Sequence, residues 1–154
     1  MKIKGAHVVF YRLLRANSAS SVCAVLLYKR TQDAPMYPGY WGLIGGTLEN
    51  GEQPLAGALR EVAEELGLMA TGITLELLCD VRIKRDTDPH EVGARYFAAP
   101  LNLGMDQLTL RYNPEERKVE GEGLGWFTAE EIRHMWLRPE DRAAVEKFFE
   151  RSGL

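Results

Sequence analysis

The chain has 154 residues, of which 45% are hydrophobic and 27% are charged, and its formal net charge is −3. This length suits one domain with a sizeable core, so we expect a single domain over residues 1–154. The mild negative charge argues against a basic surface for extended nucleic acid. A polyanionic substrate would have to be held locally, by a metal and a few basic side chains.

Cysteine usage points to a reduced compartment, and histidine spacing gives no zinc site. Cys23 and Cys79 lie within apolar, strand-like runs and are expected to be buried free thiols. His7, His90 and His134 are scattered and do not have the spacing of zinc ligands. No apolar run is long enough to span a membrane, so the predicted location is the cytoplasm.

The first part of the chain alternates β-rich runs with turn formers. Residues 6–14 and 22–28 are predicted strands, and the second is placed centrally in a sheet because no polar residue interrupts it. Residues 31–39 contain Pro35, Pro38 and Gly39, which predicts a loop. A short strand over residues 41–44 then leads to a glycine pair.

A helix follows the glycine pair, with clear signals at both ends. Pro54 suits a first helical position and Gly67 suits a C-terminal cap, which predicts a helix from Pro54 to Leu66. Four residues at helical spacing form the expected apolar stripe: Leu55, Leu59, Val62 and Leu66.

Three carboxylates gather on the other side of this helix. At about 100° per residue, Glu61, Glu64 and Glu65 are expected to lie together on the face away from the stripe. Glu61 and Glu65 repel each other as an i,i+4 pair, so the group favours a cation, and hard oxygen ligands suit Mg²⁺ or Mn²⁺. The alternative is an ordinary solvated acidic face. A phosphate-binding P-loop is excluded because Glu52 stands where that motif needs lysine.

The second half of the chain supplies the remaining elements. We expect strands over residues 73–83, 92–99, 108–112 and 124–127, a turn over 85–90, a helix opened by the Thr128–Glu131 capping box, and a last helix opened by Pro139. Hairpin spacings mixed with crossover spacings predict an α/β fold with a mixed β-sheet between helices.

The stretch around the glutamate-rich helix resembles the Nudix box, Gly-x5-Glu-x7-Arg-Glu-U-x-Glu-Glu-x-Gly-U, where U is a bulky aliphatic residue. Nine residues fill its specified positions: Gly46, Glu52, Arg60, Glu61, Val62, Glu64, Glu65, Gly67 and Leu68. A chance match is on the order of 10⁻⁹ per starting position, which favours a functional site over a solvated acidic face. The resemblance implies a Nudix-type α/β/α sandwich with the box as loop-helix-loop.

The resemblance also implies a chemistry, metal-assisted substitution at a phosphorus of a diphosphate. It assigns the metals, Mg²⁺ or Mn²⁺, to Glu61, Glu64 and Glu65 with help from the carbonyl of Gly45. Either Glu61 or Glu65 would also activate the attacking water. The same resemblance suggests Glu120, shortly before Trp126, as a metal ligand from outside the box. Glu122, Glu115 and Glu116 are the alternative acids, and an exposed loop acid without a metal is the alternative role for Glu120.

Several other residues are candidates with supporting roles. Glu52 and Arg60 are expected to pair with each other or with the ligand glutamates, and to fix their rotamers. Arg30 and Tyr40 are the candidates for substrate binding. Arg82, Lys84 and Arg95 are further candidates to bind phosphates, with an ordinary surface charge as the alternative for each. Tyr37, Tyr40 and Phe10 could stack on a base, but packing in the core or at its rim is favoured for any one of them. The expected partner is a small-molecule nucleotide, and a homodimer is possible in this family.

The family admits several activities. The small size and absence of an added domain favour a MutT-like nucleoside triphosphate pyrophosphohydrolase that releases a nucleoside monophosphate and pyrophosphate. A nucleotide-sugar or ADP-ribose pyrophosphatase is the alternative among enzymes, and a non-catalytic Nudix-fold binding module is the alternative outside them. One departure is Ile44, where many members have proline before the glycine pair.

Overall fold

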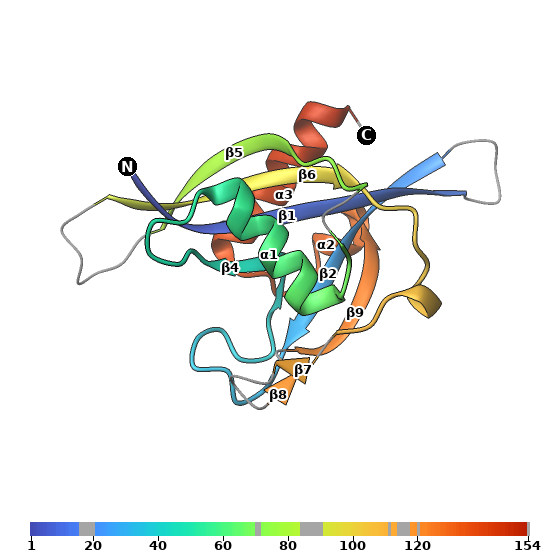
Figure 1. Ribbon diagram of the computed structural model, residues 1–154. Helices are drawn as coiled ribbons and strands as arrows, with labels where there is room; N and C mark the ends of the chain where they lie inside the picture. Colours follow the sequence, from blue (N-terminus) through green and yellow to red (C-terminus); the bar gives the residue numbers. More distant parts are fainter. Residues whose placement is uncertain are drawn as a thin grey trace.

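A mixed β-sheet lies between one helix on its front face and two helices on its rear face (Figure 1). The computed structural model describes residues 1–15, 21–69, 72–83, 91–110, 112–113, 118–119 and 121–153. Helix α1 (Pro54–Leu66) covers the front, while α2 (Ala129–Ile132) and α3 (Pro139–Ser152) cover the rear. The predicted α/β/α sandwich is confirmed.

The sheet is built around the long first strand. Its strands are β1 (Lys2–Arg15), β2 (Ser21–Arg30), β3 (Trp41–Gly42), β4 (Ile44–Thr47), β5 (Glu76–Ile83), β6 (Val92–Pro100) and β9 (Gly121–Thr128). They run in the order β3-β2-β1-β6-β5, with β4 also pairing with β1 and β9 with β2. The pairing of β1 with β6 is parallel and the others are antiparallel. The short strands β7 (Tyr112–Asn113) and β8 (Lys118–Val119) pair separately.

Alternation along β1 divides the core between the two faces. Val8 and Phe10 are fully buried in the cluster that includes Val62 of α1, whereas Val9 is fully buried in the cluster that includes Val145 of α3. Successive side chains of a strand point to opposite faces, so β1 supplies both cores. Phe10 is fully buried, so it packs in the core, as the sequence favours, and it cannot stack on a base.

Strand β5 departs from the predicted alternation. The predicted strand over residues 73–83 begins only at Glu76, and its register against β6 shifts between Leu77 and Cys79. The extra residue makes Leu78 the buried one, at 8% exposed, and leaves Leu77 59% exposed. A bulge of this kind changes which residues face the core.

The segment after β6 is also more irregular than predicted. Leu108 is buried, but residues 108–110 form no strand, and a short 3₁₀ turn, η1 (Met105–Gln107), precedes them. Side chains hold this segment, because Arg12 Nη1 and Trp126 Nε1 both donate to the Leu103 carbonyl at 3.0 Å. Such bonds to side chains have no signature in local periodicity.

The helix ends follow the predicted chemistry. The capping box between Thr128 and Glu131 is present at α2, and Pro139 opens α3. Gly67 ends α1 with φ of 70°, as a left-handed cap requires. Among the described helices, none is both long and apolar enough to cross a membrane. Cys23 and Cys79 are both free thiols, and Cys23 is buried as predicted, whereas Cys79 is only partly buried.

Candidate active site

The site begins at Gly45 and Gly46 of β4, a strand of the sheet that lies between α1 on the front and α3 on the rear. A Cβ on Gly45 would lie 2.3 Å from the Ala6 carbonyl oxygen and 2.4 Å from His7 Nδ1, and the residue has φ of 151°. A Cβ on Gly46 would lie 2.6 Å from Glu61 Oε1. These distances are far below van der Waals contact, so only glycine leaves room for the imidazole on one side and the Glu61 carboxylate on the other.

Arg60 is the centre of the ion pairs on α1. Its guanidinium donates to Glu52 through two bonds, Nε to Oε2 at 2.8 Å and Nη2 to Oε1 at 2.9 Å. Nη1 lies 3.1 Å from Glu61 Oε1 and 3.3 Å from Glu64 Oε2. Nη2 also donates to the Thr47 carbonyl at 3.2 Å, which fastens the helix to the end of β4. The expected pairing of Glu52 and Arg60 is present.

These contacts shift the protonation equilibria of both partners. The hydrogen bonds from Arg60, with a further one from the Glu49 amide, lower the pKa of Glu52 from 4.5 to about 2. The hydrogen bond to Glu52 and the charges of Glu61 and Glu64 raise the pKa of Arg60 above its ordinary value. Both groups therefore stay charged across the physiological range.

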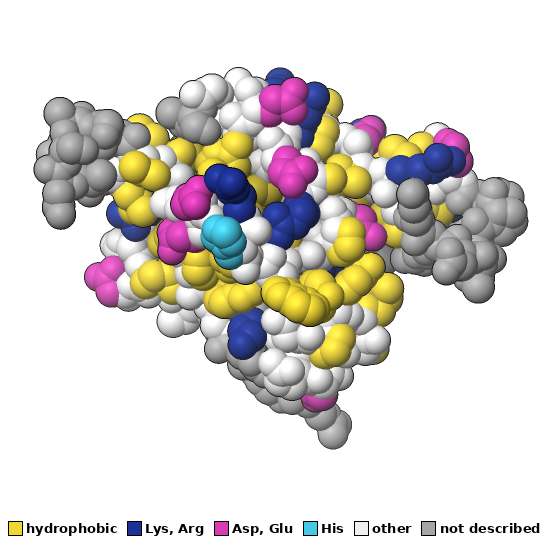
Figure 2. Space-filling model, turned by 180° about the vertical axis from the view of Figure 1, so that it is seen from behind, with side chains coloured by type: hydrophobic (Ala, Val, Ile, Leu, Met, Phe, Trp, Pro, Cys, Tyr) yellow, Lys and Arg dark blue, Asp and Glu magenta, His cyan; other side chains and the backbone are white. Residues whose placement is uncertain are grey.

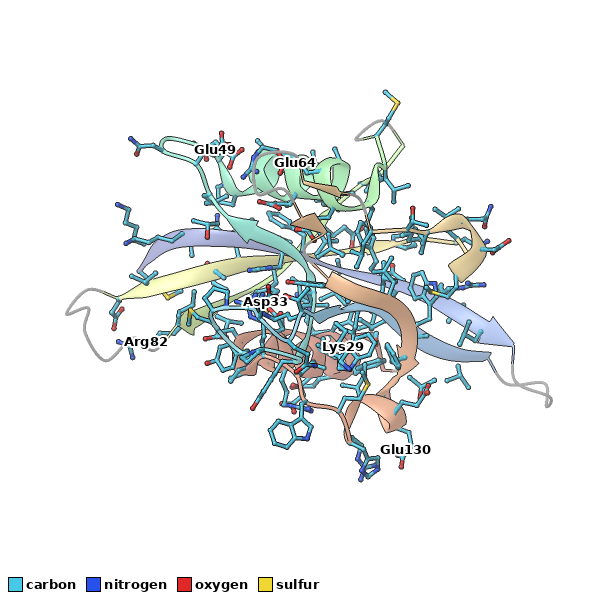
Figure 3. The ribbon with its side chains drawn as sticks, turned by 90° about the horizontal axis from the view of Figure 1, so that it is seen from below. Lys29, Asp33, Glu49, Glu64, Arg82 and Glu130 are labelled. Carbon is cyan, nitrogen blue, oxygen red and sulfur yellow. The ribbon has the colours of Figure 1, made fainter. Side chains whose placement is uncertain are left out.

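The three candidate metal ligands differ in burial. Glu65 is 6% exposed, the Glu61 side chain 12% and the Glu64 side chain 51%. Exposure thus rises from Glu65 through Glu61 to Glu64, and these three acids are called the carboxylate row below, with Glu65 as its inner end. Figure 3 shows Glu64 on the α1 layer with Glu49 nearby.

The deepest of these carboxylates affects a buried phenol on β2. Burial, followed by the negative charge of Glu65, raises the pKa of Tyr28 to about 12. Tyr28 therefore stays protonated at the inner end of the row, where its O–H group is a neutral neighbour for the acid.

The predicted apolar stripe of α1 was wrong in part. The buried residues are Gly57, Ala58, Val62, Glu65 and Leu66, while Leu55 is 47% exposed. The helix is turned toward its small residues, because a Cβ on Gly57 would lie 2.3 Å from Leu48 Cδ2. This rotation places Glu65 against the sheet instead of on the exposed side.

The donor atoms suit a hard divalent cation. Carboxylate oxygens are the ligands that Mg²⁺ and Mn²⁺ prefer, and Gly46 leaves space for the Glu61 carboxylate beside the chain. As the described side chains stand, no three carboxylate, imidazole or thiol groups converge closely enough to hold a metal ion. Glu61 and Glu64 instead contact Arg60, whose positive charge offsets theirs.

The candidate substrate residues lie in different places. Arg30 Nη1 donates to the Tyr28 hydroxyl at 3.2 Å, and Nε donates to the Met36 carbonyl at 2.9 Å, so Arg30 adjoins the buried phenol. Tyr40 instead packs between Tyr37 and Trp136, with ring centroids 5.3 Å away in each case. The structure therefore connects Arg30, but not Tyr40, to the carboxylate row.

The remaining basic candidates are engaged in ion pairs on the sheet. Arg95 pairs with Asp80 at 2.8 Å, and Arg82 pairs with Glu91. Glu120, the predicted ligand from outside the box, lies outside the described residues, as do Lys84, Glu115 and Glu116.

Two residues near the site carried no signal in the sequence analysis. Tyr28 ends an apolar strand, and nothing in its neighbourhood indicated a polar role. Asp141 is an acid in the first turn of a helix, where acids are common because they suit the helix dipole. Its full burial becomes apparent only from the tertiary structure.

The fold and the complete Nudix box define a class of protein. A family model described as the NUDIX domain matches residues 5–150, nearly the whole chain. This chain belongs to the Nudix hydrolase family, and the prediction of a pyrophosphohydrolase family is confirmed.

Curated relatives include two proteins with stated activities. The nucleoside triphosphatase NudI of Escherichia coli is 45% identical over 121 residues, spanning 77% of this chain and 75% of that protein. The m7GpppN-mRNA hydrolase NUDT17 of Xenopus laevis is 28% identical over 117 residues, spanning 72% of this chain but only 39% of that protein.

Solved structures support the same architecture. A MutT NUDIX hydrolase from Burkholderia pseudomallei aligns with a TM-score of 0.68 at 26% identity, covering 96% of this chain and 98% of the other. The NUDIX domain of Shewanella oneidensis NrtR, solved with ADP ribose, aligns with a TM-score of 0.70 at 18% identity, covering 99% and 89%. A C. elegans Ap4A hydrolase aligns with a TM-score of 0.71 at 21% identity over the full length of both chains. The last two likenesses concern the fold alone.

Proposed function

We propose that this chain is a metal-dependent hydrolase of a nucleoside diphosphate linked to another group, with nucleoside triphosphates as its substrates. The observation that carries the proposal is the complete Nudix box on one helix, with Arg60 bonded to Glu52 and close to Glu61 and Glu64. The similarity to a nucleoside triphosphatase over three quarters of that protein supports this choice of substrate.

We assign the cation, Mg²⁺ or Mn²⁺, to Glu61, Glu64 and Glu65, with the Gly45 carbonyl and Glu120 as further ligands. When bound, a divalent ion neutralises the diphosphate and acidifies an attacking water. The chain's own contribution is the placement of the donors. The buried Glu65 and the mostly buried Glu61 are the two candidates to accept the proton of that water.

Arg60 has a positioning role in this proposal. Its two hydrogen bonds to Glu52 use Nε and Nη2, and the remaining nitrogen, Nη1, lies close to Glu61 and Glu64. These contacts limit the rotamers of both carboxylates and offset their mutual repulsion until a cation binds. Arg30, beside Tyr28, is the candidate to contact a substrate phosphate.

A panel of nucleotides tests the proposal. Each of the canonical nucleoside triphosphates, ADP-ribose, a nucleotide sugar and a capped RNA dinucleotide would be incubated with Mg²⁺, and phosphate and pyrophosphate measured separately. A triphosphate should give its monophosphate and pyrophosphate, with oxygen-18 from water located in one of these products. Orthophosphate as the sole phosphate product from a triphosphate would contradict the proposed reaction, and absence of turnover with every substrate would favour a binding module.

A further inference from the structure

A buried carboxylate on the rear face of the sheet touches the chain just before the glycine pair. Asp141, in the first turn of α3, is fully buried. Its Oδ1 accepts a hydrogen bond from the Tyr96 hydroxyl at 2.6 Å, and its Oδ2 accepts one from the Leu43 amide at 3.0 Å. A buried carboxylate is tolerated only when such bonds replace its hydration, so both contacts constrain their donors.

Leu43 stands at a break in the sheet. Strand β3 ends at Gly42 and β4 begins at Ile44, and the Leu43 amide donates to Asp141 between them. A Cβ on Gly42 would lie 3.0 Å from Asp141 Oδ2, so glycine allows this close approach. Helix α3 of the rear layer is therefore hydrogen-bonded to the chain two residues before Gly45.

The segment between α2 and α3 makes further hydrogen bonds to β3. Trp41 N donates to the Trp136 carbonyl at 2.7 Å, and Arg138 N donates to the Trp41 carbonyl at 3.0 Å. These bonds fasten the start of α3 to β3, so Asp141 is held at a fixed distance from Leu43. Figure 2 shows this rear face, where acidic and basic side chains are interspersed among hydrophobic ones.

A second path runs from Asp141 to Gly45 through two rings. Tyr96, bonded to Asp141, stacks on His7 with centroids 5.1 Å apart and planes 21° from parallel. The His7 ring lies against Gly45, where a Cβ would be 2.4 Å from Nδ1. The carboxylate thus contacts the Leu43 amide directly and is linked to Gly45 through the Tyr96 and His7 rings.

The other side of this backbone is the proposed active site. Consecutive residues of a strand face opposite sides, and Gly45 faces His7 while Gly46 faces the Glu61 carboxylate. A shift of the chain at Gly45 therefore changes the room for Glu61 at Gly46. No side chain of Asp141 needs to reach the front face for this effect.

We propose that Asp141 is a positioning residue for the front-face site: through Leu43 and the Tyr96–His7 stack it sets the backbone of Gly45 and Gly46 against which Glu61 is placed. The inference rests on the proposed function for its consequence in catalysis, but not for the backbone coupling. Residues that orient metal ligands through an intermediate contact typically change metal affinity or activity by about 10–100-fold when altered.

The test compares Asp141→Asn with Val145→Ala. The asparagine keeps the side-chain volume and removes the charge, while Val145 is a buried residue of the same helix and the same core cluster that makes no polar contact with Leu43. Amide hydrogen exchange and chemical shifts of Leu43 to Gly46 are measured without metal. We expect faster exchange at Leu43 and shifted Gly45 and Gly46 signals in Asp141→Asn only. Tyr96→Phe, which removes one of the two bonds, gives a second reading if Asp141→Asn does not fold, and it should shift the same signals by a smaller amount.

Activity supplies the second reading, at temperatures where the variants are equally folded. The Mn²⁺ concentration for half-maximal turnover should rise about 10–100-fold in Asp141→Asn and stay at the parent value in Val145→Ala. Equal Mn²⁺ midpoints in the two variants would overturn the inference, as would parent-like amide signals in Asp141→Asn and Tyr96→Phe. If the parent hydrolyses no nucleotide, the proposed function fails separately, and the amide measurements still decide whether Asp141 sets the glycine backbone.

Discussion

Arg60 and Glu52 are joined side by side, with Nε 2.8 Å from Oε2 and Nη2 2.9 Å from Oε1. The geometry is that of a bidentate pair, which fixes the guanidinium plane as well as its position. Because the pair spans the start and the middle of the loop-helix segment, it links the Glu52 turn to the row of glutamates on α1. The predictions below begin from this pair.

Loss of Arg60 should affect both stability and turnover. Arg60→Ala leaves the 14% exposed Glu52 side chain without its main donor and removes the contact to Glu61. We expect a lower free energy of unfolding than in the parent, since a charged acceptor loses its main donor. Chemical denaturation measures this change, and initial rates should show a smaller kcat than the parent. Arg133→Ala, which breaks an exposed pair on α2, is the matched control and should change neither quantity appreciably.

The same pair predicts a pH dependence. Glu52 has a folded pKa of about 2 against 4.5 without its partners, so folding favours its ionised form. Its stabilising contribution is fully present above about pH 4.5 and is lost as the pH falls through the folded pKa near 2. Denaturation midpoints measured from pH 6 to pH 2 should therefore fall less steeply in Glu52→Gln than in the parent. Asp80→Asn is a useful comparison, because Arg95 lowers the pKa of the Asp80 carboxyl on β5. If the denaturation midpoints of Glu52→Gln and the parent fell equally steeply with pH, Glu52 would not contribute to the acid sensitivity of the fold.

The glutamate row should be essential for turnover. Glu64→Gln and Glu65→Gln each replace a carboxylate by an amide of similar size, and kcat should drop by on the order of 10²–10⁴-fold. A chelator should abolish activity in the parent, and Mg²⁺ or Mn²⁺ should restore it. Glu146→Gln, an exposed glutamate on α3, should turn over like the parent. Circular dichroism checks that the folds persist, and parent-like turnover in either Glu64→Gln or Glu65→Gln would refute the catalytic assignment.

The close approach of Gly46 to Glu61 gives a steric prediction. Gly46→Ala would place Cβ 2.6 Å from Glu61 Oε1, so the carboxylate has to move away from the chain. We expect weaker Mn²⁺ binding and a lower kcat, measured by metal titration and initial rates. Gly51→Ala is the matched control, because a Cβ there meets no atom within 4 Å although its φ of 78° adds strain. That variant should be somewhat less stable yet bind Mn²⁺ like the parent; equal metal binding in both variants would show that the contact at Gly46 is unimportant.

Local chemistry explains which parts of the fold could be predicted. Helix α1 has its predicted bounds because Pro54 and Gly67 determine where it begins and ends through local backbone geometry, independently of the rest of the fold. The bulge between Leu77 and Cys79 was missed because an extra residue in one strand leaves no mark on a run of alternating apolar residues. The rotation of α1 toward Gly57 was missed for a related reason, since it depends on contact with Leu48 from a preceding loop.

The site was predictable where its residues share one segment. Glu52 and Arg60 are eight positions apart within one motif, whereas the hydrogen bond from Leu43 to Asp141 joins residues 98 positions apart. Arg30 was identified as a candidate, but its contact with Tyr28 depends on the course of the loop that follows it. Long-range bonds of this kind are set by packing of the two layers and have no counterpart in spacing.

Glu120 stays a prediction as a metal ligand, and its chain neighbour now gives a reason to test it. Gly121 pairs with Arg30 across β9 and β2, and a Cβ on Gly121 would lie 2.9 Å from Tyr28 Cδ2. Tyr28 in turn is the phenol whose pKa is raised by burial and then by the charge of Glu65, so the residue beside which Gly121 lies is electrostatically coupled to one of the candidate ligands. Two hard cations need about six oxygens each, more than three carboxylates supply, which favours a further acid from this strand.

The experiment separates Glu120 from the other acid beside Gly121. Mn²⁺ would be titrated against Glu120→Gln and Glu122→Gln, with binding followed by the paramagnetic signal of free Mn²⁺ and turnover measured in parallel. We expect Glu120→Gln to bind Mn²⁺ about 10–100-fold more weakly and to lose kcat, while Glu122→Gln stays close to the parent. The reverse result would move the ligand two residues along the strand, because parent-like metal binding in Glu120→Gln leaves that carboxylate no role in holding the cation.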